Sequence, residues 1–407
     1  MLSHPISHHE LRHVMLRLLI IAITVAISPA AAQQKVNIPS LDGRLTLDGY
    51  WFRANQGTEA HPAVIALHGC GGALTNAGLL PLAARREAGD FNAEGIHYLV
   101  LDSFTTRGAK SICEIPSSRR SIHEEDRRRD VFAAIQWLSR QHGVDATRTA
   151  IIGRSHGGST VLSVVDATDG EVQAQPLAPR AAIALYPGCI KFTKMFNYAV
   201  RTPLLMLAGA LDNWTPASQC EDLQAKIKRA DSKAPSHLTI YPESHHAFDS
   251  TTPVRVRTGV GNTLSGTASV GGNPVAREAA RQATFEFLAR EFGITLRYDH
   301  ATRFHTHRKP VPAASGFAEA HDIARVPLSE KGRERYNYYT SLPTPKAFVI
   351  TTKGGWYMMS DDANAVPIAF DLCRENGVEC WLYAVDSRVV WTEDVSKRIG
   401  PEAWIKQ

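Results

Sequence analysis

Short apolar runs alternate with longer helical patterns along most of the chain. The runs typical of buried strands lie at residues 62–67, 97–101, 149–152, 181–186, 203–208 and 237–241. Between them, stretches such as 124–141 repeat apolar positions at the spacing of one helix face. Residues 45–52 predict a hairpin that turns at Asp48-Gly49, and residues 275–292 predict a closing amphipathic helix. This alternation predicts an α/β fold with a mostly parallel, doubly wound sheet covered on both faces.

The strand at 149–152 leads directly into the sequence Gly153-Arg154-Ser155-His156-Gly157-Gly158, which has the pattern of a nucleophile elbow. Glycines two residues before and after the serine allow neighbouring backbone to pass closely. The helix expected next places Ser155 at a helix N-terminus, where unpaired N–H groups favour a developing negative charge. Ser155 is therefore the candidate nucleophile for acyl transfer.

Two further polar residues follow strands later in the chain. Asp212 comes after the strand at 203–208, and His246 comes after the strand at 237–241. The order Ser, Asp, His is that of a triad in this architecture, and the carboxyl ends of parallel strands meet at one edge of the sheet. Taken alone, Asp212 could be a helix cap and His246 one of 17 histidines. Together they predict an orienting acid and a general base, with the neighbouring His245 outside the triad.

The strand at 62–67 runs into His68-Gly69-Cys70-Gly71-Gly72. Such a loop offers one backbone donor of an oxyanion hole, and the residue after the nucleophile offers the other. We expect the amides of Cys70 and His156, with Gly69 as the alternative to Cys70. An ordinary turn or a phosphate cradle is the competing interpretation, but no Gly-Lys-Ser/Thr follows and the glycines do not fit a dinucleotide fingerprint. No cofactor and no metal are predicted.

Six motifs together resemble the dienelactone hydrolase family of the α/β-hydrolase fold, over roughly residues 36–295. They are HGCGG at 68–72, DSFTTRG at 102–108, GRSHGG at 153–158, YPGC at 186–189, LDNWTP at 211–216 and HHAFD at 245–249. The resemblance implies hydrolysis of an ester or lactone, with Ser155 as nucleophile, Asp212 as acid and His246 as base. One position departs from the family: its dienelactone-cleaving members use a cysteine where this chain has Ser155. Dienelactone itself is therefore not the expected substrate.

The N-terminus and the cysteines predict export. A basic residue, an apolar run at 18–27 and the small residues at 30–32 predict a signal peptide over residues 1–32, with Met15 as an alternative start. The run is shorter than the roughly 20 residues of a spanning helix, so no stable membrane span is expected after cleavage. All six cysteines lie beyond residue 32, which favours disulfides in a periplasmic or secreted protein. From their places along the chain we expect the pairs Cys70–Cys113, Cys189–Cys220 and Cys373–Cys380.

The composition is that of an ordinary globular protein, with 44% hydrophobic residues and a mild net charge of +5. The run Arg127-Arg128-Arg129 opens a helical pattern, and we interpret it as a solvated helix face. Nothing in these features indicates a nucleic-acid partner.

The sequence predicts four segments. We expect a signal peptide at 1–32, an α/β-hydrolase domain at 33–295, a linker at 296–345 and a small Cys-stapled α+β domain at 346–407. In the linker, His305 and His307 could bind a metal but fit a solvated segment better. In the last domain, the sequence predicts a hairpin, a helix and a second hairpin. Its expected role is stabilisation, with an accessory contact as the alternative.

Three residues are candidates for substrate binding. Arg107 could meet a substrate carboxylate, or it could pair with a local acid such as Asp102 or Glu114. Tyr186 and Trp214 could form the wall of an acyl pocket, or they could be ordinary core residues. The sequence thus predicts an exported serine hydrolase acting on a small ester or lactone. A peptidase or acyltransferase with the same triad is one alternative, and a non-catalytic exported binding protein is another.

Overall fold

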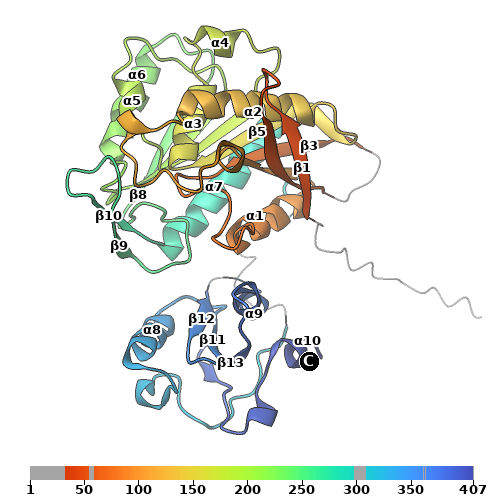
Figure 1. Cartoon of the computed structure of the whole chain (residues 1–407), viewed down its shortest axis with the longest axis vertical. Helices are drawn as coiled ribbons and strands as arrows, with labels where there is room; N and C mark the ends of the chain where they lie inside the picture. The colour runs from red at the N-terminus through yellow and green to blue at the C-terminus, as the bar shows by residue number, and fades with distance from the viewer. Residues whose placement is uncertain (1–32, 55–58, 298–308, 361, 363, 407) are drawn as a thin grey trace, which may run out of the picture.

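The computed structural model describes residues 33–54, 59–297, 309–360, 362 and 364–406, and its first part is built around an eight-stranded sheet (Figure 1). In spatial order the strands are β1 (Gln33–Pro39), β2 (Thr46–Phe52), β4 (His97–Asp102), β3 (His61–Leu67), β5 (Val144–Arg154), β6 (Ala181–Leu185), β7 (Leu204–Gly209) and β8 (Ser236–Tyr241). The pairs β1–β2 and β2–β4 are antiparallel, whereas every pairing from β4 to β8 is parallel. The predicted mostly parallel sheet of an α/β-hydrolase is confirmed.

Helices cover both faces of this sheet, as the buried strands require. One face carries α1 (Leu82–Ala93) and α7 (Pro274–Phe292). The other carries α2 (Glu124–Leu138), α3 (His156–Val164) and α6 (Ala217–Arg229), with the short helices α4 (Gly170–Gln173) and α5 (Ile190–Thr193) in its connections. The closing helix α7 begins where the Asn273 side chain accepts hydrogen bonds from two backbone N–H groups. It ends at Gly293, whose φ of 65° stops the helix.

The hairpin predicted around Asp48-Gly49 is wrong. These two residues lie inside the continuous strand β2, which pairs with β1 on one side and β4 on the other. The chain instead reverses at the preceding pair, Asp42-Gly43, between β1 and β2. There the Ser40 hydroxyl donates to Asp42 and accepts from the Leu45 N–H. Both Asp-Gly pairs have turn chemistry, and pairing with two neighbouring strands decides which of them stays extended.

A separate four-stranded antiparallel sheet forms the C-terminal part. Its order is β12 (Trp356–Met359), β11 (Ala347–Thr351), β13 (Cys380–Val385) and β14 (Arg388–Val389). Helix α9 (Ala365–Glu375) packs on one face, and the Cys373–Cys380 disulfide joins its last turn to β13. A final helix, α10 (Pro401–Lys406), contributes Trp404 to the same apolar cluster. The predicted order of hairpin, helix and hairpin agrees with this arrangement.

The linker predicted at 296–345 differs from the structure. Within it, a short 3-10 turn at Ile323–Arg325 and helix α8 (Glu330–Thr340) cover the other face of the small sheet. Tyr336 and Tyr339 are fully buried, and their rings pack edge to face on Phe348 of β11. This segment therefore belongs to the core of the C-terminal part. Its aromatic residues do not recur at the regular spacing of a helix face, and the sequence pattern therefore predicted a connector.

The two parts touch through the first helix of the hydrolase part. Leu82 of α1 belongs to the apolar cluster of the C-terminal part and is 8% exposed. One turn later, Arg86 forms an ion pair with Asp362 and places one Nη 3.4 Å from the Met359 sulfur. The boundaries of the predicted domains remain a prediction.

Two earlier expectations fall outside the described residues. They are the signal peptide at 1–32 and the histidines His305 and His307. Within the residues that the structure describes, no helix combines the length and the apolar character needed to cross a membrane.

Candidate active site

Ser155 lies at the sharp turn between β5 and α3. Its φ of 54° and ψ of −118° are unusual for a residue with a side chain and typical of a nucleophile elbow. A Cβ on Gly153 would lie 2.2 Å from the Gly157 carbonyl oxygen, and a Cβ on Gly157 would lie 2.3 Å from the Leu67 carbonyl oxygen. The backbone crossing that exposes Ser155 thus leaves no space for a side chain at either glycine.

Ser155, His246 and Asp212 are joined by two hydrogen bonds. His246 Nε2 lies 3.0 Å from Ser155 Oγ, and His246 Nδ1 lies 2.8 Å from Asp212 Oδ2. Because an ionised carboxylate only accepts, Nδ1 carries the proton and Nε2 is free to accept from the serine hydroxyl. Asp212 Oδ1 in turn accepts the N–H groups of Trp214 and Thr215, at 2.8 and 2.9 Å.

The environment of Asp212 favours its charged form. Burial raises the pKa of this carboxyl, but the charge and hydrogen bond of His246 and the two backbone donors outweigh it, so the pKa lies below its ordinary value. The Thr215 hydroxyl adds a contact of 2.9 Å to Asp212 Oδ2 and lies 3.1 Å from His246 Nδ1. Thr215 is not among the site residues predicted from the sequence. An aspartate followed three residues later by threonine is the signal that could have found it.

The imidazole of His246 contacts two aromatic rings. The centroids of the Tyr186 and Trp214 rings both lie 4.8 Å from its own. Trp214 also lines the cavity that contains Ser155, and its role as a substrate contact stays a prediction. Tyr186 lies in a different cavity and donates its hydroxyl to Asp249 at 2.7 Å. The neighbouring His245 is held by the Leu211 carbonyl oxygen, 3.1 Å from its Nδ1.

The loop after β3 lies against the elbow. A Cβ on Gly69 would lie 3.5 Å from the Ser155 Cβ, and the Cys70–Cys113 disulfide ties the loop to the segment after β4. The backbone N–H groups of Cys70 and His156 have no hydrogen-bond acceptor among the described residues. Two unpaired donors beside a nucleophile are the arrangement an oxyanion hole needs. The structure also forms the other two expected disulfides, Cys189–Cys220 and Cys373–Cys380.

A cavity of about 470 Å³ opens in front of Ser155. Its wall combines Cys70, His156 and Trp214 with four basic side chains, which are Arg120, His123, Lys191 and Lys194. One carboxylate, Glu124, also lies in the wall, and Lys191 pairs with it at 3.0 Å. The space in front of the nucleophile is therefore small and mainly basic.

Arg107 does not extend toward this cavity. Its guanidinium forms a two-pronged ion pair with Asp130 of α2, both distances being 2.8 Å, and donates to the Ser103 carbonyl oxygen at 2.7 Å. Arg107 therefore pairs with an acidic residue of the protein, as the alternative from the sequence stated, although that residue is neither Asp102 nor Glu114. Asp130 lies 23 residues away along the chain, and only the packing of α2 on the sheet brings it close.

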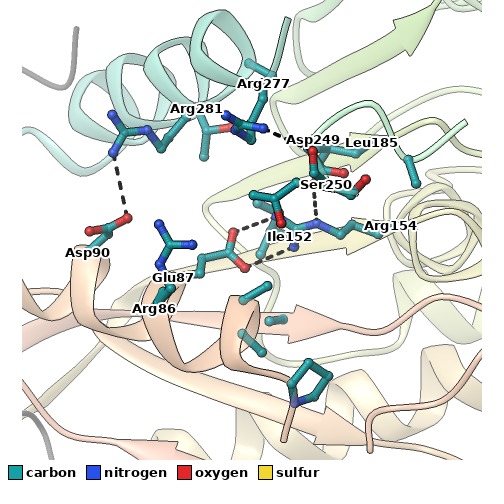
Figure 2. Close-up of a pocket in the computed structure, with 18 of the residues that line it drawn as sticks. Arg86, Glu87, Asp90, Ile152, Arg154, Leu185, Asp249, Ser250, Arg277 and Arg281 are labelled. Atoms are coloured by element: carbon teal, nitrogen blue, oxygen red, sulfur yellow. Dashed lines mark hydrogen bonds and ion pairs between the residues drawn. The ribbon is translucent and has the colours of Figure 1, made fainter. Parts of the chain in front are cut away.

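An ion-pair network lies behind the elbow, between α1 and α7 (Figure 2). Arg154, the residue before the nucleophile, places Nε 2.5 Å from Asp249 and its two Nη atoms 3.0 and 2.8 Å from Glu87. Asp249 follows the base by three residues. Arg154 therefore links the strand that leads into Ser155 to the loop that carries His246, and no sequence pattern predicts this link.

The arginine run at 127–129 is not the solvated face that the sequence suggested. Arg127 and Arg128 are 0% and 4% exposed, whereas Arg129 keeps about half of its side chain in solvent. Arg128 pairs with Asp169 at 2.8 Å and with Glu171. Arg127 contacts the two loops beside Ser155. Helix α2 turns this charged segment inward because each guanidinium finds acceptors that the sequence pattern does not reveal.

Comparison with known proteins gives one family. Residues 104–292, which carry Ser155, Asp212 and His246, match the sequence model of the dienelactone hydrolase family. The resemblance noted from the sequence motifs is thereby confirmed. No curated protein matches the chain.

Solved structures similar to this chain include the following two enzymes. One is a thermophilic esterase from Thermogutta terrifontis, with 15% identity, 67% of this chain and 96% of that chain covered, and a TM-score of 0.46. Another is a dienelactone hydrolase-like promiscuous phosphotriesterase from metagenomic libraries, with 16% identity, 64% and 98% covered, and a TM-score of 0.46.

Proposed function

We propose that this protein is an exported serine hydrolase that cleaves a carboxylic ester or lactone through an acyl-enzyme. The observation that carries the proposal is the chain of two hydrogen bonds from Ser155 Oγ through His246 to Asp212. The match of residues 104–292 to the sequence model of a hydrolase family supports the reaction class. The three disulfides support an oxidising compartment, in agreement with the signal peptide predicted from the sequence.

In the first half of the reaction, Ser155 Oγ attacks the carbonyl carbon of the substrate. Its proton moves to His246 Nε2, and Asp212 stabilises the imidazolium that results. The carbonyl oxygen becomes an oxyanion and accepts from the N–H groups of Cys70 and His156. When the tetrahedral intermediate collapses, the bond to the alcohol oxygen breaks and His246 returns its proton to that oxygen.

In the second half, water replaces the alcohol. His246 Nε2 removes a proton from a water molecule, whose oxygen attacks the acyl carbon of the ester on Ser155. The same two amides stabilise the second oxyanion. Collapse then breaks the bond to Ser155 Oγ, which regains a proton from His246 and releases the acid. For a lactone the alcohol and the acid are the two ends of one product.

The wall of the cavity supports a substrate with a negative charge. Arg120 and Lys194 lie in the wall with Lys191, whereas Glu124 is the one carboxylate in it. A cation within such a small cavity raises the local concentration of an anionic ligand. We therefore expect an ester or lactone that carries a carboxylate or a similar group to react faster than its neutral analogue.

Labelling of the purified mature protein with a fluorophosphonate tests the proposal. We expect covalent labelling of Ser155, found by peptide mapping, and none in Ser155→Ala protein. A panel of short p-nitrophenyl esters, lactones and peptide amides then separates an esterase from a peptidase. Absence of labelling and of hydrolysis in folded wild-type protein would favour the non-catalytic binding protein instead.

A further inference from the structure

Arg127 is an enclosed cation that the mechanism above does not use. It lies one turn into α2 and is the largest fully buried side chain of the described residues. Its guanidinium carbon lies 5.2 Å from the centroid of the Phe104 ring. Burial lowers the pKa of Arg127 to about 10, against the opposing effect of Asp130 and Glu124, so the group stays protonated at neutral pH.

The two ends of its guanidinium contact two different loops. One Nη donates to the His68 carbonyl oxygen at 2.7 Å, and the other donates to the His156 Nδ1 at 2.8 Å. His68 lies two residues before Cys70, and His156 directly follows Ser155. These are the loops that carry the two proposed oxyanion donors. Because a guanidinium is planar and rigid, its two N–H groups fix the spacing of the atoms that accept from them.

Both histidines at this contact are neutral. Arginine only donates, so His156 Nδ1 accepts and its proton lies on Nε2, which is 3.4 Å from Glu124 Oε1. The His68 ring spans the Gly69 carbonyl oxygen, 2.8 Å from Nδ1, and the Ser103 N–H, which donates to Nε2 at 3.3 Å. Burial and then the charge of Arg127 lower the pKa of both histidines well below the usual range. Of these three side chains, Arg127 alone is charged at neutral pH.

We propose that Arg127 is a positioning residue that sets the distance and orientation of the two oxyanion-hole amides. The inference rests on the proposed function, since it needs an oxyanion to form beside Ser155. Arg127 does not touch the substrate: it acts through the His68 carbonyl and the His156 ring. Oxyanion donors must lie within a few tenths of an ångström of their place, so a guanidinium that links both loops controls the rate of the chemical step.

The chain offers a matched control for this idea. Arg128 is the next residue of the same helix, is nearly as buried as Arg127, and pairs with Asp169 and Glu171 rather than with the loops. Arg127→Met and Arg128→Met therefore each remove one enclosed guanidinium from α2. Arg127→Lys keeps the charge and loses the planar fork, and it serves as a milder variant in case Arg127→Met does not fold.

The experiment measures kcat and KM for a p-nitrophenyl ester and for the corresponding thionoester. Sulfur accepts hydrogen bonds poorly, so the ratio of kcat/KM between the two substrates reports on the oxyanion hole. We expect Arg127→Met to lower kcat for the ester roughly 10²-fold with little change in KM, and to lower the ester-to-thionoester ratio. Arg127→Lys should lower the same ratio by less, whereas Arg128→Met should leave it at the wild-type value.

Two outcomes would overturn the inference. One is an unchanged kcat in folded Arg127→Met or Arg127→Lys protein, and the other is an equal loss on ester and thionoester, which would indicate a general structural defect. Labelling of wild-type Ser155 by a fluorophosphonate separates these failures from failure of the proposed function. If the wild-type protein takes the label and the Arg127 variants keep the wild-type ester-to-thionoester ratio of kcat/KM, only the role of Arg127 is refuted.

Discussion

A single methyl group added at Gly157 should damage both stability and catalysis. A Cβ at this position would lie 2.3 Å from the Leu67 carbonyl oxygen and 2.7 Å from that of His68. Ordinary Cβ contacts begin near 3.4 Å. The first turn of α3 or the loop after β3 must therefore move by about 1 Å, and a misplacement of that size at an active site costs roughly 10²-fold in rate.

The effect on stability can be estimated from opposing contributions. Replacement of a helical glycine by alanine favours the helix by about 1 kcal/mol. Overpacking against rigid backbone costs about 1–3 kcal/mol and more where nothing can yield. Because the closest atoms belong to strand β3 and its loop, we expect the cost to win, with a net loss of up to about 2 kcal/mol in the free energy of unfolding.

Gly89→Ala is the matched control, because Gly89 lies within α1 and a Cβ there meets nothing within 4 Å. We expect it to raise the free energy of unfolding by up to about 1 kcal/mol and to leave kcat unchanged. Urea unfolding and ester hydrolysis of the two variants make the comparison. Wild-type kcat and stability in Gly157→Ala would refute the argument that this backbone crossing is rigid.

Three other predictions concern the triad and the C-terminal part. Ser155→Ala and His246→Ala should each remove most ester hydrolysis, with little further loss in the double variant, whereas His245→Ala should keep it. Steady-state kinetics on the folded variants test this, and the reverse pattern for the two histidines would move the base to His245. Because the pKa of Asp212 is lowered in the folded protein, its carboxylate stabilises the fold fully above the ordinary value of 3.8, and this stabilisation is lost as pH falls through the lowered pKa. Asp212→Asn should therefore weaken the loss of stability at acid pH and reduce kcat by roughly 10⁴-fold. Circular dichroism that shows the same loss of stability at acid pH in the variant would contradict the first part. Residues 33–295 expressed alone should fold and hydrolyse small activated esters, with a lower melting temperature than the mature chain because Leu82 becomes exposed. If this product is insoluble or inactive while the mature chain is active, the residues after 295 belong to the hydrolase core.

Local patterns were sufficient to predict the sheet and the candidate triad. Ser155 directly follows an apolar strand, and Asp212 and His246 lie in the loops that follow two others. Parallel strands bring their carboxyl ends to one edge whatever the details of packing. The closing helix 275–292 and the three disulfide pairs could be predicted in the same way, since each depends on spacing or on position along the chain. The same reasoning failed where two local signals were equal, as at the two Asp-Gly pairs near β2.

Only the tertiary structure determined which partners the charged side chains find. Arg107 pairs with Asp130, Arg154 joins Glu87 to Asp249, and Arg127 holds the loops beside Ser155. These partners lie 23 to 95 residues apart along the chain, where no periodicity connects them. A strand or helix is specified by its neighbours in sequence, because its hydrogen bonds and apolar face repeat locally. A buried ion pair is specified by the packing of separate elements, since its cost of desolvation is offset only when the partner arrives from elsewhere in the fold.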